Sequence, residues 1–260
     1  MYDDFSSDYD RFVNWPGRLA AELPFIEREL QAVGARSLLD AACGTGMHTL
    51  ALAQRGYVAL GTDLSAGMIE RARANAEAAG LDVRFEVAGL GASRATVGAP
   101  SGDLAPSGDL DAVLCLGNSL PHMLTPAELA EALADFAACL RPGGLLLIQN
   151  RNFDAVMARR ERWMSPQAHR EGETEWLFVR FYDFESDGTL TFNMTTLRRQ
   201  GAGEWEQQIA ATRLRPLRQG ELTSALAAAD FNSIVCYGDM SGAPFDPESS
   251  GNLVMTARRA

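Results

Sequence analysis

The stretch Leu38-Leu39-Asp40-Ala41-Ala42-Cys43-Gly44-Thr45-Gly46-Met47-His48-Thr49 decides the fold. It begins as an apolar run typical of a buried strand, breaks at two glycines, and continues as Leu50-Ala51-Leu52-Ala53 with helical spacing. A strand, a tight glycine turn and a helix N-terminus in this order suit a nucleotide-type cofactor. Asp63 ends the next apolar run, 57–62, where its carboxylate can accept hydrogen bonds from a ribose diol.

The segments around this stretch repeat the alternation of strand and helix. A fourth apolar run is followed by Thr125-Pro126, which predicts a helix with Thr as N-cap and Pro at the first helical position. Ser65 is the expected N-cap of an earlier helix, and Gly80 its end. This rhythm predicts an α/β fold with a parallel, doubly wound sheet. The expected strands are 36–42, 57–62, 83–87, 111–116 and 145–149, and the expected helices are 46–55, 65–79 and 125–140.

The remaining segments are assigned less directly. Residues 5–33 read as helical, with a second helix starting near Pro24, and form either a packing pair or a lid. Residues 89–109, rich in Gly, Ala, Ser and Pro, predict a loop. The expected organisation is one structural domain with four parts: a helical lid (1–35), a cofactor-binding core (36–149), an inserted antiparallel β segment (150–216), and a closing helix with a strand pair (217–260).

The insert is predicted to be a β meander. Trp176, Phe178, Arg180, Tyr182 and Phe184 alternate and share one face, and Asp187-Gly188 predicts a two-residue hairpin turn before a return strand that includes Leu190-Phe192-Met194. A third strand is expected at 205–215. The pattern favours an aromatic core over an aromatic cage for a quaternary amine. The chain should then close with a helix at 219–229 and strands near 232–237 and 252–258.

Composition excludes several classes of function. A chain of 260 residues with 47% hydrophobic residues can form one sizeable domain. Its net charge of −11 would repel a phosphate backbone, so a nucleic-acid partner is not expected. Residues 1–5 are acidic and polar, unlike a signal peptide, and no apolar run reaches the length of a membrane span. We expect a cytoplasmic protein without a membrane partner, and homo-oligomer formation stays open.

The cysteines also favour a cytoplasmic protein. Cys43, Cys115, Cys139 and Cys236 lie in apolar segments and form no Cys-x-x-Cys pair. This arrangement favours small core residues in a reducing compartment over zinc ligands or disulfides. No metal site is expected.

Two residues distinguish between cofactors. A nicotinamide-binding fingerprint needs a third glycine three residues after Gly46, where this chain has Thr49. Asp40 puts an acid near the place where phosphates would lie. An acid there suits a cationic cofactor, with a sulfonium and an ammonium, better than an anionic dinucleotide. A nicotinamide-dependent dehydrogenase is therefore only a distant alternative.

The stretch 39–46 resembles the first motif of class I S-adenosylmethionine-dependent methyltransferases. Asp63 matches their ribose-binding acid, and Arg141-Pro142-Gly143-Gly144 matches the turn before their fifth strand. These markers cover roughly residues 36–149 in the family's order, and the combination is more specific than any one of them. The resemblance implies a Rossmann-like, mostly parallel seven-stranded sheet that binds S-adenosylmethionine and releases S-adenosylhomocysteine.

The same resemblance implies the cofactor site. The glycine turn would face the methionine part of the cofactor, and Asp63 would bind both ribose hydroxyls. Asp63 as a helix cap and Asp40 as a turn residue are the structural alternatives. Many relatives have a polar residue near the adenine after the third strand, where this chain has Ala88-Gly89-Leu90. The implied cofactor site comprises Tyr9, Trp15, Arg18, Asp40, Ala42, Gly44, Thr45, Gly46, Asp63, Leu64, Met68, Leu90 and Leu116.

Two further motifs resemble glycine and glycine/sarcosine methyltransferases. Gly117-Asn118-Ser119-Leu120-Pro121-His122 is similar to their Gly-Asn-Ser-x-x-His, and Asn150-Arg151-Asn152-Phe153-Asp154 to their His-Arg-Asn-Tyr-Asp. The resemblance implies that Asn118 and His122 are catalytic and that Arg151 holds a substrate carboxylate with Asn118 and Tyr182 beside it. Taken singly, a turn asparagine, a capping histidine and a solvated arginine explain these residues equally well.

The chain departs from the second motif at Asn150 and Phe153. The resemblance therefore supports N-methylation of a small amino acid or amine more than of glycine specifically. We expect in-line displacement of the methyl group by a neutral amine, with catalysis by positioning and by exclusion of water. The alternatives are a small-molecule O- or N-methyltransferase of secondary metabolism and a non-catalytic S-adenosylmethionine-binding protein.

Overall fold

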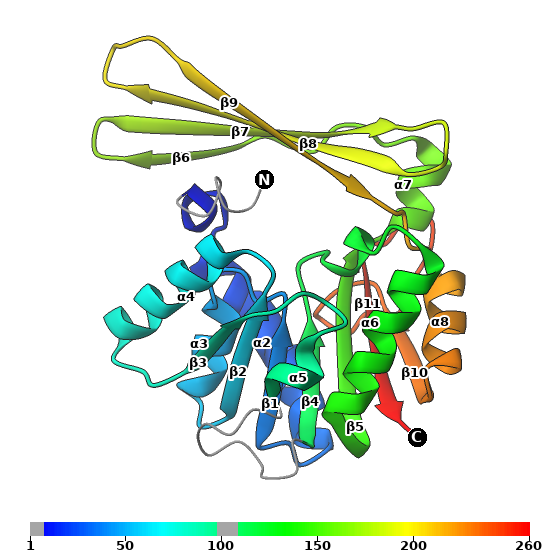
Figure 1. The fold of residues 1–260 in the computed structure, drawn as a ribbon. Helices are drawn as coiled ribbons and strands as arrows, with labels where there is room; N and C mark the ends of the chain where they lie inside the picture. Colours follow the sequence, from blue (N-terminus) through cyan, green and yellow to red (C-terminus); the bar gives the residue numbers. More distant parts are fainter. Residues whose placement is uncertain (1–7, 98–108) are drawn as a thin grey trace.

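A seven-stranded sheet, called sheet A here, forms the centre of the computed structural model, which describes residues 8–97 and 109–260 (Figure 1). Its strand order is β10-β11-β5-β4-β1-β2-β3. Only β11 runs against its two neighbours, so the predicted mostly parallel, doubly wound sheet is confirmed. The strands are β1 (Ser37–Ala41), β2 (Val58–Asp63), β3 (Arg84–Val87), β4 (Leu110–Cys115), β5 (Leu140–Arg151), β10 (Phe231–Tyr237) and β11 (Asn252–Arg259).

Helices cover both faces of sheet A. In β1, Leu38 packs in the core beneath α2 and α3, whereas Leu39 packs in the core beneath α6 and α8. Neighbouring strand residues point to opposite faces, so a strand that is covered on both sides reads as a continuous apolar run. The helices are α2 (Trp15–Ala32), α3 (Met47–Ala53), α4 (Ala66–Ala79), α5 (Ser93–Val97), α6 (Pro126–Cys139), α7 (Phe153–Arg159) and α8 (Gln219–Ala228).

The predicted helix ends are confirmed at two helices. The Ser65 hydroxyl accepts a hydrogen bond from the Met68 N–H, and Gly80 ends α4 in the left-handed conformation. Thr125 and Glu128 form a reciprocal capping box at the start of α6. These caps fix where α4 begins after β2 and where α6 begins after the segment that follows β4.

Two predictions near the N-terminus and in the glycine-rich segment are wrong. A new helix does not start near Pro24, because α2 runs through it from Trp15 to Ala32. Pro24 is exposed while Leu23 and Phe25 are buried, so core packing outweighs the lost hydrogen bond. Within the predicted loop 89–109, residues 93–97 form α5, where Asp135 accepts hydrogen bonds from two N–H groups at its start. Residues 98–108 lie outside the described part.

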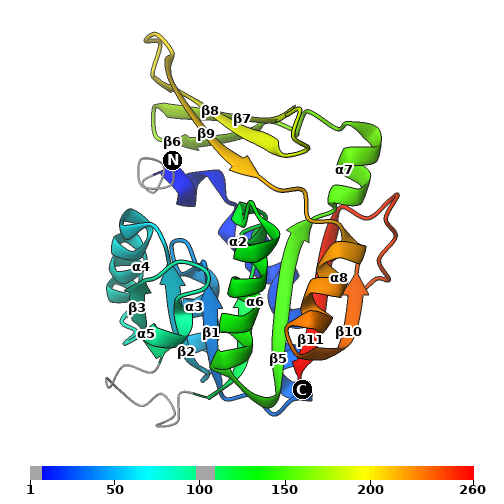
Figure 2. The same cartoon turned by 45° about the vertical axis from the view of Figure 1, so that its right-hand side comes forward.

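A second, antiparallel sheet, called sheet B, lies across the carboxyl ends of the parallel strands in both views (Figures 1 and 2). It has four strands rather than the expected three, because β6 was not predicted; its apolar pattern is too weak to recognise. The hairpin loop is also longer than two residues, since the flanking strands end at Phe184 and resume at Leu190. The strands, in spatial order, are β6 (Gln167–Glu171), β7 (Thr174–Phe184), β8 (Leu190–Gln200) and β9 (Glu206–Leu214).

A buried polar network ties α2 to α3 and β5. The Glu22 carboxylate contacts His48 Nε2 at 2.7 Å and Arg18 Nε at 3.1 Å, and it accepts a hydrogen bond from Gln149 Nε2 at 2.9 Å. Burial alone would raise the pKa of Glu22, but the hydrogen bond from His48 and the charge of Arg18 outweigh it and lower the pKa to about 2. Each of these residues therefore supports the position of the others.

The glycine turn is packed against β3. Gly46 has φ +79°, and a Cβ atom there would lie 2.7 Å from the Phe85 ring. We expect Gly46→Ala to lower the free energy of unfolding by roughly 2–4 kcal/mol, from left-handed backbone strain and overpacking together. Denaturant titration measures this loss of unfolding free energy. Gly56→Ala is the matched control, because Gly56 has φ +89° with open space around it and should show only the backbone strain. Equal losses in both variants would contradict the role of Phe85.

Ionised Glu22 should make stability depend on acid pH. Because the folded pKa lies below the unfolded value, its contribution is complete above about pH 4.5 and is lost as pH falls toward about 2. We expect the difference in unfolding free energy between wild type and Glu22→Gln to shrink by a few kcal/mol between pH 5 and pH 2.5. Exposed Glu206→Gln is the control. A difference that does not change with pH would refute this role.

Candidate active site

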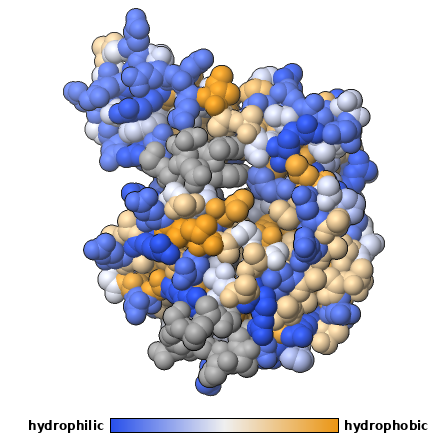
Figure 3. All heavy atoms as spheres, viewed as in Figure 1, coloured by the Kyte–Doolittle hydropathy of each residue, from blue (hydrophilic) through white to orange (hydrophobic). Residues whose placement is uncertain are grey.

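The space between the two sheets holds two adjoining cavities of about 480 and 370 Å³. The larger, called the β2 cavity, lies at the ends of β1 and β2. The smaller, called the β7 cavity, lies beneath sheet B. Tyr9, Gly117, Asn118 and His122 line both, so the two spaces meet at these residues. Figure 3 shows hydrophobic side chains gathered in the hollow between the two layers, and exposed Leu64 and Leu124 line this part of the β2 cavity.

The β2 cavity combines one carboxylate with an apolar slot. Asp63 Oδ2 accepts a hydrogen bond from Gly44 N–H at 2.9 Å, and its Oδ1 accepts one from Ser65 N–H at 2.9 Å. A carboxylate oxygen can accept more than one hydrogen bond, so these two bonds do not exclude further ones from a ligand. Asp63 therefore shapes the turn that precedes α4 and also faces the cavity. The apolar wall consists of Leu64, Met68, Ala88 and Leu90.

Other predicted cofactor residues lie behind this lining. Asp40 is buried, and its Oδ2 accepts a hydrogen bond from Thr49 Oγ1 at 2.7 Å. Burial raises the pKa of Asp40 against the opposing charge of His48. Gly46 faces Phe85, and Leu116 is buried. Asp40 and Gly46 support the turn and the start of α3, and Leu116 packs in the core beneath α2. Ala42 and Gly44 line the cavity itself with left-handed backbones.

The N-terminal helical residues 8–12 lie between the two sheets. Asp10 Oδ1 accepts hydrogen bonds from Thr45 Oγ1 at 2.6 Å and from Trp15 Nε1 at 2.9 Å. On the other side, the Phe12 ring packs edge-on against Phe178 of sheet B, with centroids 5.4 Å apart. Tyr9 thereby lines both cavities. Burial raises the pKa of its phenol, against the charge of Arg18.

The turn after β4 presents Asn118 at the junction of the cavities. Gly117 and Asn118 both have positive φ, at 71° and 70°. The Arg151 backbone N–H donates to Asn118 Oδ1 at 2.9 Å, and Gln149 Oε1 accepts from Gly117 N–H at 3.2 Å. Because an N–H can only donate, the amide oxygen of Asn118 must face Arg151. β5 therefore sets both the backbone and the side chain of this turn.

Two titratable side chains near the junction are neutral at pH 7. Burial lowers the pKa of His122, which lies in the short 3₁₀ turn Leu120–His122. Burial also raises the pKa of Tyr182 to about 12, although the Arg151 and Arg180 cations oppose this. The junction thus offers a neutral imidazole, which can accept a hydrogen bond.

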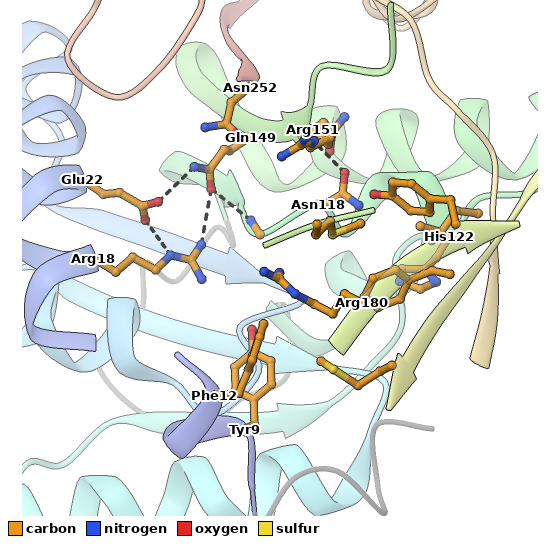
Figure 4. Close-up of a pocket in the computed structure, with 17 residues that line it drawn as sticks. Tyr9, Phe12, Arg18, Glu22, Asn118, His122, Gln149, Arg151, Arg180 and Asn252 are labelled. Carbon is orange, nitrogen blue, oxygen red and sulfur yellow. Dashed lines mark hydrogen bonds and ion pairs between the residues drawn. The ribbon is translucent and has the colours of Figure 1, made fainter. Parts of the chain in front are cut away.

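The β7 cavity gathers three arginines (Figure 4). Arg18 pairs with Glu22, and its Nη2 lies 3.4 Å from Gln149 Oε1. Arg151 Nη2 pairs with Glu161 Oε1 at 3.0 Å. Arg180 extends from β7, and Figure 4 shows its guanidinium pointing into the cavity.

The structure thus brings Tyr9, Arg18, Asn118, His122, Arg151 and Tyr182 around one space, whereas Trp15 and Thr45 lie outside the lining and hold Asp10. The sequence analysis did not identify Glu22 or Gln149. The only sign of them in the sequence is that Glu22 is a polar residue on the apolar face of a helix and Gln149 a polar residue in an apolar strand. It noted Arg180 on the apolar face of its strand without assigning it a function.

Across the described ranges 8–97 and 109–260, no helix is both long and apolar enough to cross a bilayer. In the same ranges, no cluster of His, Cys, Asp and Glu side chains has the arrangement of a metal site.

Comparisons with known proteins agree on the fold and on the type of activity. Residues 38–144 match the family model of a methyltransferase domain. The chain is 29% identical over 252 residues to a glycine/sarcosine N-methyltransferase of Parasynechococcus marenigrum (strain WH8102), covering 91% of this chain and 77% of that protein. A second, from Halorhodospira halochloris, is 33% identical over 156 residues, covering 60% of this chain and 54% of that protein.

Solved structures agree with the fold. An S-adenosylmethionine-dependent methyltransferase from Clostridium acetobutylicum ATCC 824 superimposes with a TM-score of 0.76 over 100% of this chain and 99% of its own, at 16% identity. The residues of the β2 cavity fit S-adenosylmethionine. The left-handed backbones of Ala42 and Gly44 line the cavity beside the Asp63 carboxylate, so a ligand can approach the backbone and the acid together. The chain is an S-adenosylmethionine-dependent methyltransferase, and its sheet has the class I methyltransferase fold.

Proposed function

We propose that this methyltransferase N-methylates a small amino acid or amine of the glycine or sarcosine type. The observation that carries the proposal is the pair Arg151 and Asn118, which line one cavity and adjoin the cavity of Asp63 through a shared junction. The similarity to glycine/sarcosine N-methyltransferases supports it. We propose a matching division of labour, with residues 36–149 for the cofactor, 150–216 on the acceptor side, 1–35 as a lid and 217–260 closing the core.

The β2 cavity would hold S-adenosylmethionine, which supplies a methyl group on an electrophilic sulfonium. Asp63 would accept hydrogen bonds from the ribose hydroxyls while keeping its bonds to Gly44 and Ser65. Leu64, Met68 and Leu90 would enclose the adenine, and their apolar character explains why no polar residue is needed after β3. Tyr9 and Arg18 would face the methionine part. Asp40, Thr45, Gly46, Trp15 and Leu116 would act by supporting the turn.

The acceptor amine would lie at the junction. One lone pair of Asn118 Oδ1 is held by the Arg151 N–H, and the second can accept an N–H of the amine. This orients the nitrogen lone pair, and catalysis follows from that positioning. The neutral imidazole of His122 would accept a hydrogen bond from the methylated ammonium, whose proton then passes to solvent. The Arg151 guanidinium would bind a carboxylate of the acceptor through parallel hydrogen bonds, with Tyr182 beside it.

Turnover with a panel of acceptors tests the reaction. We expect S-adenosylhomocysteine and a methylated amine, measured by mass spectrometry, from glycine, sarcosine, dimethylglycine or related amino acids. Formation no faster than in the absence of acceptor would refute N-methylation. Equal rates with amines that lack a carboxylate would favour a broader small-molecule methyltransferase. Binding of S-adenosylmethionine without any turnover would favour a non-catalytic protein.

A binding cycle tests Asp63. We expect Asp63→Asn to weaken S-adenosylhomocysteine binding by about 10- to 100-fold, the usual worth of a hydrogen bond to a charged group. The 2′-deoxy analogue should bind wild type more weakly, yet lose little further in Asp63→Asn. Calorimetry gives the four dissociation constants. If the variant weakens both ligands equally, Asp63 acts only through the turn at Gly44 and Ser65.

A further inference from the structure

Arg180 occupies a position where a charge is costly. Along β7 the side chains of Phe178, Arg180 and Tyr182 share one face, and Phe178 and Tyr182 are 0% and 3% exposed. Arg180 pairs across the sheet with Met194, which is also buried. A cation that is buried among apolar side chains loses its hydration, and this costs free energy unless an anion or a hydrogen-bond acceptor replaces the water.

The partners of Arg180 within residues 8–97 and 109–260 do not balance its charge. Its Cζ lies 4.8 Å from the centroid of the Phe12 ring, a cation–π contact. Its Nε is buried and has no hydrogen-bond partner among these residues. None of their carboxylates forms a salt bridge with it, whereas Arg18 is paired with Glu22 and Arg151 with Glu161.

The β7 cavity therefore contains one guanidinium more than its paired carboxylates balance. Arg151 is close enough for its charge to act on Arg180, and both side chains line the same space (Figure 4). An arginine keeps its proton even when half-buried. One unbalanced positive charge calls for one negative charge, which matches a carboxylate rather than a phosphate dianion. Arg151, already held by Glu161, is the less available of the two.

We propose that Arg180 is the primary anchor for the acid group of the methyl acceptor, and that it makes this site select amines that carry one carboxylate. This inference rests on the proposed function and names the acceptor class. The amine would lie toward Asn118 and the carboxylate toward Arg180, with Arg151 as the second contact. Arg180 is thus a specificity-determining residue, supplied by sheet B rather than by the cofactor-binding sheet.

Arg180→Met tests the assignment, with Arg180→Lys as the conservative variant. Steady-state kinetics should show that Arg180→Met raises KM for glycine or sarcosine by at least about tenfold. Arg180→Met should leave KM for glycinamide within twofold, and Arg180→Lys should recover part of the lost affinity for the acid. Arg198→Met on β8 is the matched control, because Arg198 is exposed and pairs with Glu206 outside the cavity. Equal effects on the acid and its amide would overturn the inference.

Binding measurements separate this inference from the proposed reaction. Calorimetry of acetate with protein saturated in S-adenosylhomocysteine should detect a site that Arg180→Met weakens at least tenfold, even if no acceptor is turned over. If S-adenosylhomocysteine affinity falls in place of acetate affinity, Arg180 serves the cofactor and the inference fails. Thermal unfolding without ligand provides a further readout. Arg180→Met should be at least as stable as wild type, because Met suits the apolar face, whereas a merely structural arginine would lower the melting temperature.

Discussion

The hydrogen bond from the Gly44 N–H to Asp63 Oδ2 joins the end of β1 to the end of β2. It holds the left-handed turn at Gly44 against the neighbouring strand, and it fixes the carboxylate at the edge of the β2 cavity. The helix cap at Ser65 depends on the same side chain through Asp63 Oδ1. One carboxylate thus sets the turn, the start of α4 and the cavity wall, which explains why an acid at this place is a marker of the fold as well as of the cofactor.

Arginines of the β7 cavity serve two different purposes, which are stability of the fold and recognition of a ligand. Arg18 belongs to the network of Glu22, His48 and Gln149, where every charge has a partner and the result is rigidity. Arg180 has no such compensation among the described residues. A protein selected for stability alone would place an apolar residue there. Retaining a poorly compensated charge next to a cavity is typical of sites where a ligand completes the interaction.

Much of the fold could be predicted because local patterns report it directly. The apolar runs of β1, β2 and β4, the cap at Ser65 and the box at Thr125 depend only on neighbours in sequence. The prediction of a new helix at Pro24 was wrong because the effect of this proline depends on the core beneath α2. Strand β6 was not predicted because its sequence has no apolar alternation. The predicted positions of Asn118, His122 and Arg151 came from resemblance. The Glu22–Gln149 contact could not be predicted, since it joins residues 127 apart in sequence.

Sheet B lies wholly outside the stretch matched by the methyltransferase domain, residues 38–144. Just after β9, the Arg215 N–H donates a hydrogen bond to the Pro121 carbonyl in the turn after β4, at 2.8 Å. The proposed acceptor contacts thus come from two sources, with Asn118 and Arg151 supplied by the core and Arg180 and Tyr182 by sheet B. Substitutions on the inner face of sheet B would therefore change the acceptor side of the cavity while leaving the glycine turn and Asp63 in place.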